Sequence, residues 1–173
     1  MNETFSPHVK LALQTINEFV RTGKIIDIPP DSPVELTERK AGVFVSLHKR
    51  GELRGCIGTI QATTGSIAEE IVSNAISACS RDWRFQPVQP NELSELECTV
   101  DVLEAAEPVS NLLEMDPKVY GVIVKKGGRK GLLLPDLDGV ESVEHQISIA
   151  LRKAGISEDE DYELFRFKVT RYR

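Results

Sequence analysis

The stretch Leu53-Arg54-Gly55-Cys56-Ile57-Gly58-Thr59-Ile60 predicts the second strand of a β-hairpin whose first strand is Gly42-Val43-Phe44-Val45-Ser46-Leu47-His48. The intervening residues are Lys49-Arg50-Gly51. A two-residue turn needs a positive φ at Arg50, which is unfavourable for a residue that carries a Cβ. We therefore expect a three-residue turn in which Gly51 adopts the left-handed conformation and forms a bulge.

The hydrophobic pattern of the two strands predicts their register. With a bulge at Gly51, Phe44 lies opposite Cys56 and Ser46 lies opposite Arg54. The core face then comprises Val43, Val45, Leu47, Leu53, Ile57 and Thr59. The other face comprises Phe44, Ser46, His48, Glu52, Arg54, Cys56 and Gly58. A slip of one residue places every side chain on the wrong face, so the pattern favours this register.

The second face carries the residues with chemical potential. Arg54 and Cys56 project from one side, about 6–7 Å apart at the backbone given the rise of a strand. A nearby guanidinium favours the thiolate, which is the nucleophilic form of cysteine. Gly55 and Gly58 weaken the strand and indicate close approach by a ligand or another backbone, with open space above Gly58. The alternative is that Cys56 is a small buried apolar residue, as free cysteines usually are.

The composition is that of a globular protein of one domain or two small lobes. The chain has 173 residues, of which 40% are hydrophobic and 28% charged. The formal net charge of −6 argues against a nucleic-acid-binding protein, which has a basic face. The basic C-terminus is the exception, and its alternative role is protection of a strand edge.

Cysteine usage and hydropathy predict a reduced, cytoplasmic protein. The three cysteines are Cys56, Cys79 and Cys98, an odd number without close pairs. The first ten residues contain no apolar leader, and no run approaches the 18 apolar residues of a membrane span. No spacing typical of a structural zinc site occurs, so we expect none and assign no metal ligands. The spacing leaves open a metal held by residues distant in the sequence.

The order of elements predicts an α+β fold with a mainly antiparallel sheet and flanking helices. Helices are expected from Ser6-Pro7 to Gly23, after Ser66 to about Cys79, and from Ser142 to Ala154. Further strands are expected at 96–102, 120–126, 131–134 and 162–171. Strand–strand–helix–strand thus occurs twice. We expect two related halves, roughly 1–103 and 104–173, that share a sheet and form unequal lobes with a ligand cleft.

A second group of candidate residues follows the middle helix. Arg81-Asp82-Trp83-Arg84-Phe85 combines two arginines, an acid and two aromatic residues in one loop. Such residues can clamp an anionic ligand, with Asp82 orienting Arg84. A local ion pair with packed aromatic rings explains the same pattern.

Several motifs, in one order along the chain, resemble the AMMECR-type domain family, also called system protein A of the AmmeMemoRadiSam group. The most specific is Leu53-Arg54-Gly55-Cys56-Ile57-Gly58. The others are Asp82-Trp83-Arg84-Phe85, Leu93-Ser94-Glu95-Leu96-Glu97, the run from Gly127 to Pro135, and Lys153-Ala154-Gly155-Ile156. The resemblance implies an α+β fold of two unequal lobes. It also implies genomic association with Memo-like proteins and radical S-adenosylmethionine enzymes, and it supplies no established reaction or cofactor.

Three functions are compatible with these patterns. The first is a cysteine-dependent enzyme with Cys56 as nucleophile or redox thiol, Arg54 lowering its pKa, and His48 as candidate base. In that enzyme Gly55, Gly58, Asp82, Arg84 and Arg129 bind a small anionic substrate. The second is a binding or scaffold module for the Memo-like and radical S-adenosylmethionine partners, in which Cys56 is buried. The third, RNA binding through the basic C-terminus, is disfavoured by the acidic total.

Overall fold

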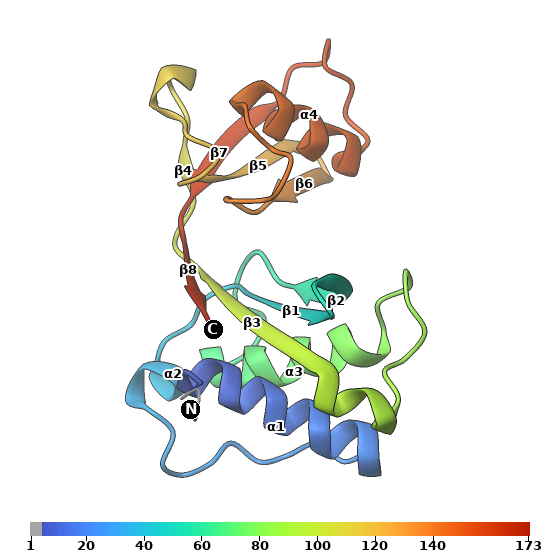
Figure 1. Cartoon of the computed structure of the whole chain (residues 1–173). Coiled ribbons are helices and arrows are strands. Elements are labelled where there is room, and N and C mark those ends of the chain that lie inside the picture. Colours follow the sequence, from blue (N-terminus) through green and yellow to red (C-terminus); the bar gives the residue numbers. More distant parts are fainter. Residues whose placement is uncertain (1–4) are drawn as a thin grey trace. The chain divides into compact units, whose positions relative to one another are not determined.

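The computed structural model describes residues 5–173 and divides them into two compact units (Figure 1). The first unit comprises the described residues up to Val102 together with Thr170–Arg173, and the second comprises Leu103–Val169. Each unit has its own four-stranded sheet. The predicted α+β class is confirmed, whereas the predicted single shared sheet is wrong.

The first unit places two helices on one face of its sheet. The strands are β1 (Val43–Lys49), β2 (Glu52–Gly58), β3 (Leu96–Leu103) and β8 (Val169–Tyr172), in the order β2-β1-β3-β8. Helix α3 (Ile67–Ser80) packs on β1 and β2, and α1 (Pro7–Thr22) packs on α3 (Figure 1). A short α2 (Val34–Glu38) and a 3₁₀ helix (Pro90–Glu95) complete the unit, and neither was expected.

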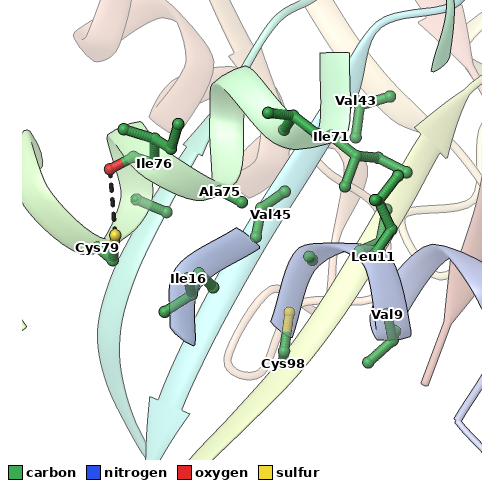
Figure 2. Packing of buried hydrophobic residues seen from close by; sticks show 14 of the residues in the cluster. Val9, Leu11, Ile16, Val43, Val45, Ile71, Ala75, Ile76, Cys79 and Cys98 are labelled. Carbon is green, nitrogen blue, oxygen red and sulfur yellow. Dashed lines mark hydrogen bonds between the residues drawn. The ribbon is translucent and has the colours of Figure 1, made fainter. Parts of the chain in front are cut away.

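Capping residues set the helix boundaries that the sequence predicts. The Ser6 hydroxyl accepts a hydrogen bond from the Val9 amide at the start of α1, and Ser66 accepts one from Glu69 at the start of α3. Gly23 ends α1 with a φ of 73°. The apolar stripes of both helices and the inner face of the sheet form one core (Figure 2), which includes Val9, Leu11, Ile16, Val43, Val45, Ile71, Ala75, Ile76, Cys79 and Cys98.

The second unit repeats the hairpin–helix–strand order of the first. Its elements are β4 (Glu107–Pro108), a 3₁₀ turn (Leu112–Glu114), β5 (Gly121–Lys126), β6 (Arg129–Leu133), α4 (Val143–Ala154) and β7 (Glu163–Phe167). The sheet order is β4-β7-β5-β6, and α4 packs on β5 and β6. The predicted repetition of strand–strand–helix–strand is therefore confirmed.

The two helices of the repeat carry a buried polar side chain at the same position, the fourth residue. In α3 this is Glu70, and in α4 it is Gln146; both are fully buried. The Glu70 carboxylate accepts five hydrogen bonds from Thr59, Thr63 and Thr64. The Gln146 amide donates to the Tyr120 carbonyl just before β5. In each unit, hydrogen bonds to one buried polar side chain thus connect the segment next to the hairpin with the first turn of the helix.

The single strand expected at 162–171 is two strands, and this explains the two sheets. Lys168 interrupts the run, so that β7 joins the second sheet and β8 joins the first. Arg171 on β8 donates to both carboxylate oxygens of Asp101 on β3, at 2.8 and 3.1 Å. Apolar alternation continues through Lys168, so the sequence pattern alone does not reveal the break.

The hairpin turn differs from the prediction. Arg50 and Gly51 both have positive φ, 54° and 80°, and Lys49 pairs with Glu52. This is a two-residue type I′ turn, whose twist matches the twist of paired strands. The Arg50 guanidinium binds Glu95 at 2.7 Å, a contact that helps to hold the unfavourable conformation.

The extra residue of the hairpin is Arg54 instead of Gly51. Leu47 pairs with Gly55 and His48 with Leu53, so Arg54 bulges from β2. Phe44 consequently lies opposite Gly58, and Ser46 lies opposite Cys56. The predicted pairing is displaced by two residues, which preserves the alternation of faces beyond the bulge. Leu53, before the bulge, is 40% exposed and does not join the core as predicted.

His8 on α1 is a buried imidazole without a hydrogen-bond partner among the described residues. Both of its ring nitrogens are inaccessible, and the ring stacks on Tyr172 of β8 at a centroid distance of 3.5 Å. Burial lowers the pKa of His8, against an opposing influence from Glu35 and a reinforcing one from Arg39. The folded protein therefore holds the neutral imidazole.

We expect the stability of the protein to decline as the pH falls below about 6.5, the ordinary pKa of histidine. Below that pH, His8 of the unfolded chain is protonated, whereas His8 of the folded protein stays neutral until a lower pH. Proton binding therefore favours the unfolded state. Thermal unfolding of wild type and His8→Phe between about pH 7 and pH 5 measures the effect. The variant should have a shallower pH dependence than wild type, because it lacks the buried imidazole. Equal slopes in wild type and His8→Phe would contradict this assignment.

Candidate functional site

Cys56 lies in a row of small polar residues on the sheet face opposite the helices. Across the strands, Cys56 pairs with Ser46, and Ser46 pairs with Thr99. The Ser46 hydroxyl donates to the Cys56 sulfur at 3.3 Å. The thiol is partly exposed. The prediction that Cys56 and Ser46 share the non-core face is therefore confirmed.

Asp82 and Arg84 bind the backbone of Cys56 at the outer edge of the sheet. β2 is an edge strand, so the N–H and C=O groups of Cys56 that face away from β1 lack a neighbouring strand. The Cys56 amide donates to Asp82 Oδ2 at 2.9 Å, and Arg84 Nη2 donates to the Cys56 carbonyl at 3.1 Å. The two side chains thus replace a pairing strand at this residue.

The same two side chains form a bidentate ion pair. Arg84 donates to the two Asp82 oxygens at 2.9 and 2.7 Å. The Arg84 bond, together with the amides of Cys56 and Arg84, lowers the pKa of Asp82 to about 2. The ion pair in turn raises the pKa of Arg84. The structure therefore brings Cys56, Asp82 and Arg84 together, with the two charges satisfying each other.

Arg54 points away from the thiol, which corrects the prediction that it lies beside Cys56. Its guanidinium binds both oxygens of Glu92 at 3.0 and 2.9 Å and donates to the Gln86 carbonyl at 2.9 Å. The reason is the bulge, which takes Arg54 out of the regular alternation of β2. Hydrogen bonds from Arg54, the Gln89 amide and Lys49 lower the pKa of Glu92 to about 2. Arg54 therefore holds the 3₁₀ helix to the hairpin.

The thiol of Cys56 is protonated near neutral pH. Burial raises its pKa above the usual value, and this effect outweighs the hydrogen bond from Ser46 and the charge of Arg84. Burial also raises the pKa of Cys79 to about 11 and of Cys98 to about 12. Both lie in the core (Figure 2). The expected lowering of the Cys56 pKa by Arg54 is wrong.

The glycines of β2 serve close packing. A Cβ at Gly58 would overlap the ring of Phe44, its partner on β1, so the space predicted above Gly58 is filled. A Cβ at Gly55 would overlap the Ala78 carbonyl oxygen of α3. Gly55 therefore lets α3 approach the sheet. Of the two alternatives predicted for these glycines, close approach of another backbone is confirmed at Gly55, and the open space predicted above Gly58 is wrong.

The remaining candidates lie outside this cluster. Arg129 belongs to the second unit, where it binds Glu160 at 2.6 and 3.1 Å and the Gly155 carbonyl beyond α4. His48, the candidate base, pairs with Leu53 and Glu97, one row beyond Ser46 along β1. Among residues 5–173, no group of three or more His, Cys, Asp or Glu side chains is placed to hold a metal ion.

Family comparison agrees with the fold and the motifs. The AMMECR1 family model matches residues 9–172, nearly the whole chain. The chain belongs to the AMMECR1 family. In this AMMECR1 domain, the helices of residues 5–173 include none that is long and apolar enough to cross a membrane.

Relatives of this AMMECR1 domain carry no functional name. A Thermotoga maritima protein is 53% identical over 96% of this chain and 97% of its own length. A Clostridium acetobutylicum protein is 50% identical over 96% of this chain, but the match spans only 36% of that longer protein. The crystal structure of an uncharacterised Pyrococcus horikoshii protein matches with a TM-score of 0.87 at 33% identity, over 95% of this chain and 88% of that one.

Three features of the site escaped the sequence analysis. The first is the ion pair between Glu92 and Arg54. The capping pattern Gln89-Pro90-Asn91-Glu92 at the 3₁₀ helix could have drawn attention to Glu92. Glu70 fastens the segment after β2, and nothing in its helical position distinguishes it from a solvated acid. Trp83 is 90% exposed, although the sequence suggested packed aromatic rings in its loop.

We expect Gly58→Ala to destabilise the protein by about 1–3 kcal/mol, the usual cost of overpacking. The added methyl group overlaps the Phe44 ring, so the double variant Gly58→Ala/Phe44→Leu should recover part of the loss. Urea unfolding measures both. Gly128→Ala is the matched control, because a Cβ at Gly128 meets no atom within 4 Å. If Gly58→Ala is as stable as Gly128→Ala, the space above Gly58 is open after all.

Proposed function

We propose that this AMMECR1 domain is a non-catalytic binding module that engages a protein partner through the loop Asp82-Trp83-Arg84-Phe85. The observation that carries the proposal is the 90% exposure of Trp83 between two side chains that are bound to β2. Tryptophan is enriched among the residues that dominate binding energy at interfaces.

The loop around Trp83 is held in one conformation by several contacts. The Phe85 amide donates to the Asp82 carbonyl at 3.0 Å, and the Arg84 amide donates to Asp82 Oδ1 at 3.2 Å. Arg54 binds the Gln86 carbonyl, which ties the end of the loop to the hairpin. A partner that covers a prearranged indole loses less conformational entropy than one that must order the loop.

The charges around the thiol favour binding over chemistry on an anion. Both arginines predicted to hold an anionic substrate have a carboxylate partner, Asp82 for Arg84 and Glu160 for Arg129. Arg54, predicted to lower the pKa of Cys56, is paired with Glu92. An anionic substrate would have to displace a bidentate carboxylate at each of these sites. The protonated Cys56 is also a poor nucleophile, since the thiolate is the reactive form.

The partners we propose are the Memo-like and radical S-adenosylmethionine proteins that the sequence resemblance implies. Two of the relatives support a modular role. The match accounts for 97% of the Thermotoga protein but for 36% of the Clostridium protein, so the same domain occurs nearly alone and within a longer chain. A domain that functions by binding tolerates both arrangements.

A cysteine-dependent enzyme that acts on a small anionic substrate is the second candidate. The specific observation in its favour is that the Cys56 thiol is partly exposed, with the Arg84 charge near enough to lower its pKa. In that enzyme, Arg84 takes the role that the sequence suggested for Arg54.

We expect Trp83→Ala to weaken binding to a Memo-like or radical S-adenosylmethionine partner from the same genome by about tenfold or more, the effect of a hot-spot residue. Calorimetric titration of the purified proteins measures the affinity. Leu113→Ala is the matched control, since Leu113 is 92% exposed but belongs to the second unit. Cys56→Ser should bind as wild type does. Equal affinity of wild type and Trp83→Ala for a partner that binds would reject the role of the loop, and absence of binding to either class would reject these partners.

We expect the rate at which iodoacetamide alkylates Cys56 to rise with pH. The apparent pKa of that rise should lie above the pKa of free cysteine, which is about 8.5. Burial outweighs the influences that favour the thiolate, which is why the rate should be low near neutral pH. Mass spectrometry of the labelled protein measures the rate, with Cys56→Ser as the blank for the two buried cysteines. An apparent pKa below that of free cysteine would favour the enzyme over the binding module.

A further inference from the structure

An elongated apolar groove in the first unit is separate from the cluster around Cys56. It has a volume of about 400 Å³ and lies between the end of α1, the segment 25–28 and α3. Its apolar lining comprises Phe19, Ile25, Ile26, Ile28, Val72 and Ile76. Its polar lining comprises Asp27, Glu69, Ser73 and Arg81. Cavities of this size with an apolar lining and a few polar groups are typical of ligand sites.

The groove follows the axis of α3 for most of its length. Its lining runs from Glu69 through Val72 and Ile76 to Arg81, twelve residues further along the chain, or about 18 Å at the rise of an α-helix. An extended peptide covers that distance with about five residues. The shape therefore suits a long, narrow occupant.

One wall of the groove offers unpaired backbone groups. Residues 25–28 have no regular secondary structure, and within the described part of the chain their amides and carbonyls take part in no hydrogen bond. The flanking backbone does form hydrogen bonds. The Lys24 amide donates to the Thr22 hydroxyl, and the Ser32 amide donates to the Pro29 carbonyl. Unpaired groups along an extended segment can pair with the backbone of an added strand.

The ends of the groove carry opposite charges. Glu69 lies in the first turn of α3, where its carboxylate also accepts from the Gly65 amide at 2.7 Å, and Arg81 follows the last turn. A second acid, Asp27, lines the wall formed by residues 25–28. Among residues 5–173, no carboxylate lies within ion-pair distance of Arg81. An occupant with an acidic group at the Arg81 end and a basic group at the Glu69 end would match this arrangement.

We propose that this groove binds an extended apolar segment of another protein, about five residues long, by backbone pairing with residues 25–28. Its apolar side chains enter the groove, and an acidic side chain at one end binds Arg81. A peptide fits better than an alkyl chain, because only a peptide provides partners for the amides and carbonyls of the wall. The site goes beyond the proposed role of Trp83 and does not depend on it.

The probe for this site is the synthetic peptide acetyl-Lys-Val-Leu-Val-Leu-Glu-amide with a fluorescent label. Its affinity follows from fluorescence anisotropy, and amide chemical shifts of the labelled protein report where it binds. We expect shifts at Ile25, Ile26 and along the Val72–Ile76 face. Ile25→Glu should weaken binding about tenfold. Val34→Glu is the matched control and should have no effect, because Val34 is 65% exposed, as Ile25 is at 66%, but lies outside the groove.

Two further comparisons test the backbone pairing and the polarity. The peptide N-methylated at alternate residues should bind about tenfold more weakly, because its pairing edge is blocked. Arg81→Glu should weaken the original peptide and strengthen binding of one that ends in Lys. Equal binding of the N-methylated peptide would contradict the backbone pairing. Displacement of the peptide by a dodecanoate anion that shifts the same amides would identify an alkyl chain, and not a peptide, as the ligand. No amide shifts up to about 1 mM peptide would overturn the site altogether.

Discussion

The structure of the first unit depends on which groups form hydrogen bonds with the backbone at the outer edge of β2. An edge strand exposes amides and carbonyls that another chain can pair with. At Cys56 the Asp82–Arg84 ion pair occupies these groups, the carboxylate accepting from the amide and the guanidinium donating to the carbonyl. Because both residues follow α3, this contact also sets where the chain goes after the helix, and it leaves Trp83 exposed between them.

Charge neutralisation around the thiol explains why the site differs from that of a typical cysteine enzyme. Reactive cysteines lie in electropositive, partly exposed surroundings that stabilise the thiolate. Around Cys56 the nearest guanidinium is already paired with Asp82, and the Arg54 guanidinium is turned to Glu92. Burial then decides the protonation state of the sulfur. The ion pairs of Arg54 with Glu92 and of Arg84 with Asp82 hold the loops in place.

The repeat shows how similar local patterns form two separate sheets. Both units contain a hairpin followed by a helix with a buried polar residue in its first turn. In α3 this residue is Glu70, a carboxylate satisfied by five hydrogen bonds. In α4 it is Gln146, which donates to the chain before β5. The interruption at Lys168 then assigns β7 and β8 to different sheets, so each unit completes its own core.

Much of the local structure was determined by the sequence itself. Ser6, Ser66 and the stop at Gly23 set helix boundaries because capping is a local interaction, and alternation set the faces of β1 because side chains of a strand alternate by geometry. The tertiary structure alone decided the bulge at Arg54, the partial burial of Cys56 and the exposure of Trp83. Each depends on a residue distant in the sequence, such as Glu92 for Arg54. Spacing within the chain carries no information about which of several carboxylates a guanidinium will bind.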